Sequence, residues 1–387
     1  MNYVELITAL TVISTAMLTL EGAWILYTTR ADKRAKEMLT QPSYSSKKKK
    51  ICLLFPAYKD VINLDKWIEW GKDGDVTYVI AEDVTRKNEK FKDRAMFVHR
   101  DSREGFKAGA VNNCLDILME KGMKFDYVIV IDADHIPFNN SVKDVYGYLE
   151  DDLIQFFWYD GLPLNTALTW LTYSSRYYSN WNLYNRKFPN LTGSGVAISY
   201  KLVKAGVRFP DSITEDYALT LDSADSKSIR VTVIPYVLCI GASPKNLKVY
   251  VKQQIRWAEG TIRDARRYFL KTMFNDTLTA YDKWDFLMHA NMYVQGLYLL
   301  VNVGVLLAGY GVGSFLAPII LFQGIAYFKT LAKTPKRYWA TYFLLNYFMA
   351  LVQVYAFLKA IFMNTGSFYA TDKSSSKSVE YSSNIAK

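Results

Sequence analysis

The chain contains little cysteine and little histidine. Its 387 residues include three of each, and the cysteines, Cys52, Cys114 and Cys239, form no CxxC pair. A structural zinc site needs four Cys or His ligands at short spacings, so a site of that kind is not expected. The scarcity fits a domain that lies in the reducing cytosol.

The chain also lacks an acidic excess. Its 47 Lys and Arg residues outnumber its 37 Asp and Glu residues, which gives a formal charge of +10. Much of the positive charge flanks apolar segments, at 30–36, 47–50 and 329–337. Positive charge beside apolar segments is typical of residues that set the orientation of a membrane protein and attract anionic lipids, and does not indicate nucleic acid binding. We therefore expect membrane lipids, and no nucleic acid, as partners.

Long hydrophobic runs are present at both ends of the chain. The run 6–27 is long enough to cross a bilayer core of ~30 Å, and basic residues follow it, which predicts that the residues after it lie in the cytosol. Further apolar runs cover 286–310, 312–328 and 339–363. The predicted units are an N-terminal transmembrane anchor (1–30), a basic linker (31–50), a catalytic domain (51–240), interfacial amphipathic helices (241–284), a C-terminal transmembrane region (285–364) and a polar tail (365–387).

Between these ends, short apolar runs alternate with helical patterns. The runs 51–55, 76–80 and 127–131 are typical of buried strands, and 107–119 has the pattern of a helix between two of them. Such alternation predicts an α/β domain with a mostly parallel sheet covered by helices. Ligands of these sheets bind beyond the carboxyl ends of the strands.

Two acidic motifs follow predicted strands or begin helices. Asp132 and Asp134 come directly after the run 127–131, and residues i and i+2 of a strand point the same way. Both carboxylates are expected to face one hard cation, Mg²⁺ or Mn²⁺, that also binds substrate phosphates. Thr214-Glu215-Asp216 fits either a catalytic carboxylate or an ordinary acidic helix start.

The stretch 248–274 is amphipathic and rich in Lys, Arg, Tyr and Trp. A helix of this composition can lie in a membrane interface. Within it, Gln253, Arg256 and Trp257 follow the spacing i, i+3, i+4 and share one helix face. The spacing alone favours a surface helix with a packed tryptophan.

The order of these motifs, Asp132-Ala-Asp134, then Thr214-Glu215-Asp216, then Gln253-Gln-Ile-Arg-Trp257, resembles the D, D, D, QxxRW pattern of processive family 2 glycosyltransferases, the hyaluronan, chitin and cellulose synthases. The resemblance implies a GT-A fold, a metal-dependent and inverting transfer from a nucleotide sugar, and a UDP-sugar as the expected donor. It assigns Asp216 as the catalytic base with Glu215 beside it. Arg256 would meet the diphosphate, and Trp257 would stack on the acceptor sugar with Gln253 nearby.

The same resemblance extends to the donor side and to the acceptor loop. Pro56 and Tyr58 stand in a segment similar to the family's P-x-Y-N-E entry, with Lys59 in place of Asn. Three further assignments follow from it: Asp83 for the nucleobase, Lys107 of a K-A-G-A-V-N box for the diphosphate together with Asp132, and Gly193 and Ser194 for the glycine-bearing acceptor loop.

The expected product is a growing β-linked polysaccharide, made by an integral protein of the cell membrane whose catalytic domain faces the cytosol. Transfer of one sugar to a polyprenyl phosphate or glycolipid is the alternative, so the acceptor is a saccharide or a lipid-linked molecule. An interpretation from another class is a catalytically inactive membrane sensor of sugar nucleotides. The segment 364–373 loosely resembles the W-G-T-R element of hyaluronan synthases, and the topology of the tail stays open.

Overall fold

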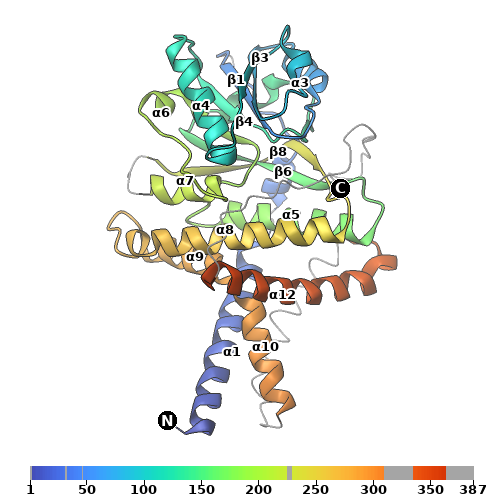
Figure 1. The fold of residues 1–387 in the computed structure, drawn as a ribbon, viewed down its shortest axis with the longest axis vertical. Helices are drawn as coiled ribbons and strands as arrows, with labels where there is room; N and C mark the ends of the chain where they lie inside the picture. The colour runs from blue at the N-terminus through green and yellow to red at the C-terminus, as the bar shows by residue number, and fades with distance from the viewer. Residues whose placement is uncertain (1, 31–32, 46, 225–228, 309–333, 363–387) are drawn as a thin grey trace.

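The computed structural model describes residues 2–30, 33–45, 47–224, 229–308 and 334–362. Eight strands form one sheet in the order β3-β2-β1-β4-β7-β6-β8-β5. Figure 1 shows the sheet and its covering helices above a layer of long helices, from which two helices project. The strands are β1 (Lys50–Ala57), β2 (Asp75–Asp83), β3 (Met96–Arg100), β4 (Tyr127–Val130), β5 (Ile136–Pro137), β6 (Leu153–Leu162), β7 (Val196–Ser199) and β8 (Val231–Ala242).

The first half of the sheet is parallel. Strand β1 pairs with β2 and β4, and β2 pairs with β3, all in parallel register. Side chains of β1 alternate between two cores: Leu53 packs in the core that contains Trp67 of α3 (Leu64–Gly71), and Leu54 packs in the core that contains Leu115 of α4 (Phe106–Glu120). Because both faces of β1 are buried, its sequence is a continuous apolar run. The strands at 51–55, 76–80 and 127–131 and the helix at 107–119 are confirmed.

The second half of the sheet mixes directions. Strand β7 runs antiparallel to both β4 and β6, β6 is parallel to β8, and β5 is antiparallel to β8. The sheet is mostly parallel, as predicted. The carboxyl ends of β1, β2 and β4 lie at one edge, which is where the predicted donor residues follow the strands.

A layer of helices lies below the sheet in Figure 1. It consists of α5 (Ala167–Asn185), α8 (Leu247–Met273), α9 (Ala280–Asn291) and α12 (Trp339–Phe362). Helix α8 coincides with the predicted amphipathic stretch, and α12 packs along it, with Tyr250 and Tyr342 in one buried cluster. The other helical elements are α2 (Lys33–Met38), η1 (Glu89–Phe91), η2 (Val142–Tyr148), α6 (Tyr200–Lys204), α7 (Glu215–Ser223) and η3 (Lys336–Tyr338).

Helices α1 (Tyr3–Thr28) and α10 (Gln295–Leu307) project together from this layer. Helix α1, with 26 residues, is the one helix of the described residues that is long and apolar enough to cross a membrane by length and composition. Its inner end is held by buried polar contacts: Nε1 of Trp24 donates to Asp285 at 2.9 Å, and Asn291 donates to Glu21 at 3.0 Å.

The C-terminal apolar runs differ from the simple spans that the sequence predicts. The run 286–310 is divided between the end of α9 and α10. The run 339–363 forms α12, which lies along α8 because one of its faces packs there and because Lys359 pairs with Glu259 at 3.0 Å. The run 312–328 and the tail element 364–373 lie outside the described residues. The predicted linker contains α2, whose Ala35 is buried in a cluster with Tyr177 and Val237.

Candidate active site

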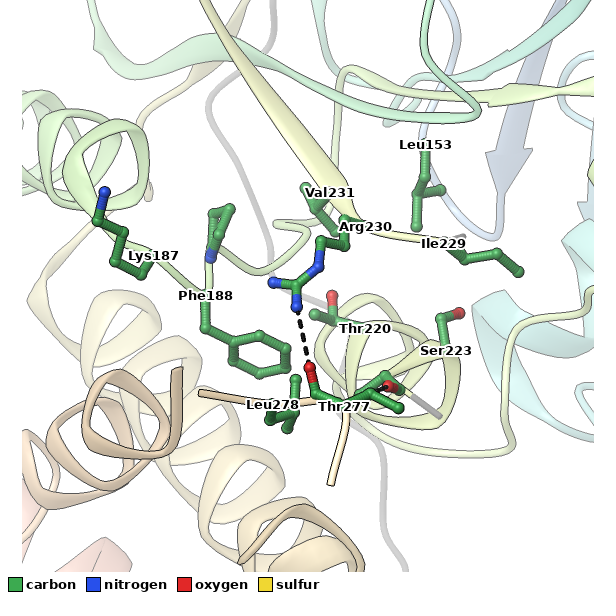
Figure 2. A pocket seen from close by; sticks show the side chains of 12 residues that line it. Leu153, Lys187, Phe188, Thr220, Ser223, Ile229, Arg230, Val231, Thr277 and Leu278 are labelled. Atoms are coloured by element: carbon green, nitrogen blue, oxygen red, sulfur yellow. Dashed lines mark hydrogen bonds between the residues drawn. The ribbon is translucent and has the colours of Figure 1, made fainter. Parts of the chain in front are cut away.

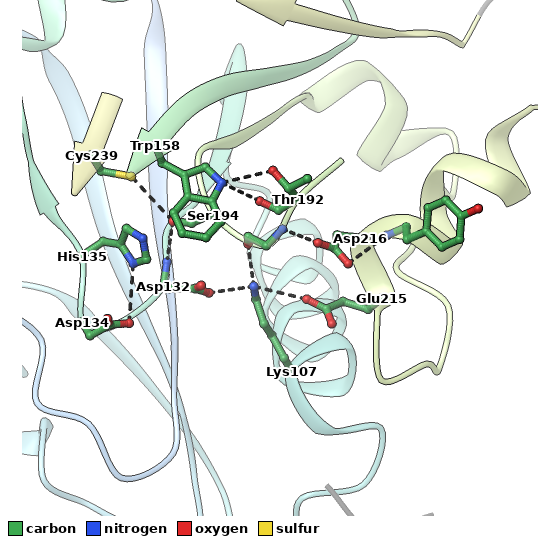
Figure 3. Close-up of polar contacts among 12 residues, drawn as sticks. Lys107, Asp132, Asp134, His135, Trp158, Thr192, Ser194, Glu215, Asp216 and Cys239 are labelled. Carbon is green, nitrogen blue, oxygen red and sulfur yellow. Dashed lines mark hydrogen bonds and ion pairs between the residues drawn. The ribbon is translucent and has the colours of Figure 1, made fainter. Parts of the chain in front are cut away.

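Lys107 connects three of the predicted motifs (Figure 3). From the start of α4, its Nζ donates to the carbonyl of Gly193 at 2.6 Å and forms ion pairs with Asp132 at 2.7 Å and Glu215 at 3.2 Å. Burial alone would lower the pKa of Lys107, but the neighbouring carboxylates, Asp132 first among them, hold it above its ordinary value. The lysine therefore stays charged between carboxylates that come from the turn after β4 and from the start of α7.

Glu215 has an unusual protonation equilibrium for a carboxyl group. Burial raises its pKa to about 7, and Asp216 adds to the shift, while the positive charge of Lys107 opposes it. Near neutral pH the Glu215 side chain is thus shared between its charged and neutral forms. This suits a group that orients Lys107 better than it suits a permanently ionised base.

The carboxylate of Asp216 lies next to Gly193 and bonds to it directly. Its Oδ2 accepts from the N–H of Gly193, and its Oδ1 accepts from the N–H of Tyr217 at 2.8 Å. Gly193 has a φ of +51°, and a Cβ placed on it would lie 3.6 Å from Oδ2 of Asp132, 3.9 Å from Oδ2 of Asp216 and 4.0 Å from the ring of Trp158. A methyl group at Gly193 would therefore touch both carboxylates and the aromatic ring.

The position of the Asp132-Ala-Asp134 motif differs from the geometry that predicted it. Strand β4 ends at Val130, so both aspartates lie in the turn after it and the strand argument does not apply to them. Each carboxylate is fixed separately. The carboxylate of Asp132 pairs with Lys107, and the backbone N–H of Asp132 donates to Oγ of Ser194 at 3.1 Å. The carboxylate of Asp134 accepts from the N–H of Ala242 at 3.3 Å.

The donor set of this turn fits a hard divalent cation. Carboxylate oxygens are the ligands that Mg²⁺ and Mn²⁺ prefer, and the side chain of Asp132 is 28% exposed, so solvent can reach it. Among the described residues no cluster of three or more His, Cys, Asp or Glu side chains could hold a metal ion by itself. The fit therefore requires further oxygen ligands from a phosphate-bearing substrate and from water.

Helix α8 is held closely against Thr214, the residue before α7, which begins with Glu215 and Asp216. A Cβ on Gly260 would lie 2.7 Å from the side chain of Thr214, so only glycine permits this approach. Asp264 accepts hydrogen bonds from Thr214 at 2.6 Å and from Ser212 at 2.7 Å. Burial raises the pKa of Asp264 to about 6, and the two hydroxyl donors oppose that shift.

Two of the three predicted residues of α8, Arg256 and Trp257, lie near this site. Burial lowers the pKa of Arg256, and the carboxylates of Glu215, Asp132 and Asp216 oppose that shift, so the guanidinium lies within range of all three charges. The ring of Trp257 lies near the guanidinium of Arg176. Gln253 is buried, and its Oε1 makes no hydrogen bond in the described part of the chain.

The predicted nucleobase region lies at the ends of β1 and β2. Asp83 is buried and forms a two-bond ion pair with Arg100, at 2.7 and 2.8 Å. Tyr58 follows β1 and packs against the guanidinium of Arg103 at 3.6 Å from its ring centroid. A Cβ on Gly109 would lie 2.8 Å from Arg100, so the glycine of the K-A-G-A box makes room for the partner of Asp83. Pro56 is half-buried near the end of β1, between the buried residues Phe55 and Ala57.

Sequence reasoning missed Arg176 and Trp158. The guanidinium of Arg176 lies 3.6 Å from the ring centroid of Trp158 and 5.4 Å from that of Trp257. Trp158 in turn donates to the carbonyl of Thr192 at 2.9 Å. One signal was available: Arg176 is the one charged residue in the sequence of α5, among aromatic and small polar residues.

A separate pocket lies away from these residues (Figure 2). It is lined by side chains that include Phe188, Thr220 and Leu278, and Arg230 donates to the carbonyl of Thr277 at 3.3 Å at its edge. Its lining contains none of the predicted catalytic, donor or acceptor residues. The chemistry predicted from the sequence is therefore gathered around Lys107 and Gly193.

Comparison with known proteins agrees with this arrangement. A model of the family described as glycosyl transferase family group 2 matches residues 127–371, which begin at β4 and include the Asp132, Asp216 and Trp257 motifs. No match was found among curated proteins. The solved structure of the mannosyltransferase PcManGT from Pyrobaculum calidifontis, in complex with GDP-Man and Mn²⁺, aligns with a TM-score of 0.57 at 19% identity, over 92% of this chain and 100% of that chain. At this identity the likeness shows a shared fold.

Proposed function

The chain belongs to glycosyl transferase family group 2, and from this premise we propose that it is a metal-dependent, inverting glycosyltransferase that acts at a membrane. The donor is a nucleotide sugar, and the acceptor is a saccharide or a lipid-linked molecule. The observation that carries the proposal is the set of contacts at Gly193: its N–H donates to Asp216, its carbonyl accepts from Lys107, and Lys107 pairs with Asp132 at 2.7 Å. These contacts bring a candidate base close to a carboxylate suited to a metal, as a single displacement requires.

In the proposed reaction Asp216 is the general base. It takes the proton of the acceptor hydroxyl while the oxygen of that hydroxyl bonds to the anomeric carbon and the bond from that carbon to the diphosphate breaks. Hydrogen bonds from Gly193 and Tyr217 hold both oxygens of Asp216 in place. One base on the face opposite the leaving group gives inversion, so an α-linked donor yields a β-linked product.

The leaving nucleoside diphosphate needs positive charge beside it. Lys107 supplies a fixed cation next to Asp132, and Arg256 lies within electrostatic range of the same carboxylate. Asp132 and Asp134 would hold Mg²⁺ or Mn²⁺, which neutralises charge that grows on the departing diphosphate. Glu215 keeps Lys107 in position through its ion pair.

The donor nucleotide is proposed to lie over the ends of β1 and β2, near Pro56, Tyr58 and Asp83. Uridine is the base expected from the sequence resemblance, whereas the structural neighbour PcManGT contains GDP-Man. Since Asp83 is already paired with Arg100, the base edge would meet a carboxylate whose orientation is fixed. Both UDP-sugars and GDP-mannose therefore belong in a donor panel.

Exposed apolar side chains support an acceptor that arrives from a membrane. Helix α1 can cross a bilayer by its length and composition, and α8 carries the candidate acceptor residue Trp257. Large exposed side chains gather at the end of α8 and along the segment after it: Phe269, Leu270, Phe274, Tyr281 and Trp284. Aromatic and aliphatic side chains at one level are typical of a helix in a membrane interface. We propose a growing polysaccharide as the acceptor, with a polyprenyl-linked acceptor as the alternative.

Release of nucleoside diphosphate from the purified protein in lipid tests the proposal. We expect release with one or more nucleotide sugars in the presence of Mg²⁺ or Mn²⁺, loss of release with EDTA, and a drop of about 10²-fold or more for Asp216→Asn. Asp222→Asn is the matched control, because Asp222 is an exposed residue on the same helix, α7, paired with Lys271 at the surface.

Sizing the product then separates a polymer from a single-sugar lipid. An Asp216→Asn variant as active as the wild type would show that the base is another group. If no donor is turned over in a native lipid extract, the transferase proposal fails and the inactive sensor becomes the better hypothesis.

A further inference from the structure

Trp158 lies at the centre of the candidate site, although no motif includes it. From β6, its ring meets the guanidinium of Arg176 on one side, and the ring of His135 packs edge to face with it at 5.0 Å between centroids (Figure 3 shows Trp158 and His135). Its Nε1 donates to Thr192, the residue before Gly193, at 2.9 Å. One side chain thus connects the turn after β4, the glycine-bearing loop and α5.

Arg176 is a buried charged residue whose position here is expected to destabilise the fold. Its side chain is 11% exposed, its ion-pair distance to Asp160 is 3.8 Å, and its buried Nε has no hydrogen-bond partner among the described residues. A buried cation with so few bonds destabilises a fold unless other groups compensate. The faces of Trp158 and Trp257 are the compensating groups on hand, since an aromatic face attracts a guanidinium.

Behind Trp158 the contacts continue to the aspartate pair. His135 is buried, and its Nδ1 lies 3.5 Å from Oδ1 of Asp134. A Cβ on Gly241 would lie 2.8 Å from both Nε2 of His135 and Oδ1 of Asp160, so glycine is required between them. Contacts therefore run without interruption from Asp134 through His135, Trp158 and Arg176 to Trp257.

We propose that Arg176 is a positioning residue that bridges the rings of Trp158 and Trp257 and so fixes the acceptor platform relative to Asp134 and the Gly193 loop. The inference rests on the proposed function, because Trp257 is the platform only if a sugar is transferred there. Arg176 acts through Trp257 and takes no part in bond making. Its removal should weaken use of the acceptor and leave donor binding largely unchanged.

A double-mutant cycle of Arg176→Gln and Trp257→Phe tests this coupling. The assay is nucleoside diphosphate release with the nucleotide sugar that the wild type turns over and a native membrane lipid extract as the acceptor source. We expect Arg176→Gln to lower kcat/KM for the acceptor about tenfold, as loss of a desolvated cation–π contact would, with the KM for the donor changed less than about twofold. In the Trp257→Phe background the same change should cost less than about twofold.

The near-UV circular dichroism of the same four proteins supplies a measurement that needs no substrate. Arg176→Gln should change the tryptophan band in both backgrounds, because Arg176 also lies over Trp158, but if Arg176 orders the Trp257 ring the change is clearly larger where Trp257 is present. Arg186→Gln is the matched control: Arg186 is also buried and also lies over a tryptophan, Trp24, at 4.8 Å, but outside the catalytic cluster. Arg186→Gln should lower the unfolding temperature without lowering kcat/KM for the acceptor selectively over that for the donor.

The outcomes separate cleanly. Equal losses for Arg176→Gln in both backgrounds, or a donor KM that rises as much as the acceptor KM, would overturn the inference and leave Arg176 as a general stabiliser of the fold. A wild-type protein that turns over no donor would instead refute the proposed function. In that case, if Arg176→Gln changes the dichroism equally with and without Trp257, the positioning role is overturned. If the change is larger where Trp257 is present, the contact between Arg176 and Trp257 is upheld.

Discussion

Replacement of Gly193 by alanine tests the space between Asp132 and Asp216 most directly. The added methyl would lie 3.6 Å and 3.9 Å from their Oδ2 atoms, which is ordinary van der Waals contact and no clash with the protein. The backbone cost is separate: a φ of +51° disfavours any residue with a Cβ by about 1–2 kcal/mol. The fold should therefore tolerate the change, while the methyl occupies the volume between the two carboxylates, where the proposed reaction places the substrate.

We expect Gly193→Ala to lower kcat/KM for nucleoside diphosphate release by about 10²-fold, because a displacement of about 1 Å between reacting groups costs that much. Gly122→Ala is the control for strain alone, since Gly122 has a φ of +64° and nothing within 4 Å of its added Cβ. The two variants should show similar decreases in thermal unfolding midpoint, and only Gly193→Ala should lose activity. Wild-type activity in Gly193→Ala, or equal loss in both variants, would refute the idea that substrate enters beside Gly193.

Two further changes test the neighbouring groups. Folding raises the pKa of Glu215 to about 7, so between about pH 4.5 and 7 the folded protein keeps a proton on Glu215 that the unfolded chain has released. The free energy of unfolding of the wild type, relative to that of Glu215→Gln, should therefore fall by roughly 3 kcal/mol as pH rises over this range. Thermal unfolding of both proteins across this pH range checks it, and a constant difference between them would contradict the shift. Gly260→Ala should push α8 away from Thr214, where its Cβ would come to 2.7 Å, at about 1–3 kcal/mol in stability and with a fall in nucleoside diphosphate release. Unaltered release would show that this close contact does not position the base.

The parts of the fold that sequence predicted are those specified by local pattern. The continuous apolar runs of β1, β2 and β4 predict strands buried on both faces, and the amphipathic pattern of 248–274 predicts α8. Asp132 was singled out because it comes just after one of these runs, whereas Lys107, in the first turn of α4, was assigned from the family resemblance. Their mutual ion pair, at 2.7 Å, agrees with the expectation that these segments meet at one edge of the sheet.

What the sequence could not give depends on contacts between distant segments. The Asp132-Ala-Asp134 motif lies in a turn, whose shape depends on Ser194 and Ala242 far along the chain. The Trp158–Arg176 contact joins β6 to α5, and neither element carries a recognisable motif. Apolar content alone also does not reveal that α12 packs along α8.

The buried polar ties of α1 have a practical consequence for anyone who prepares this protein. Removal of residues 1–30 to obtain a more soluble domain would strip Asp285 of the indole of Trp24 and Asn291 of the carboxylate of Glu21. The same Asp285 accepts from the backbone N–H groups of Lys187 and Phe188, directly after α5. Shortening the chain would therefore loosen the helix that presents Arg176, so detergent or lipid with the intact N-terminus is the better route to active material.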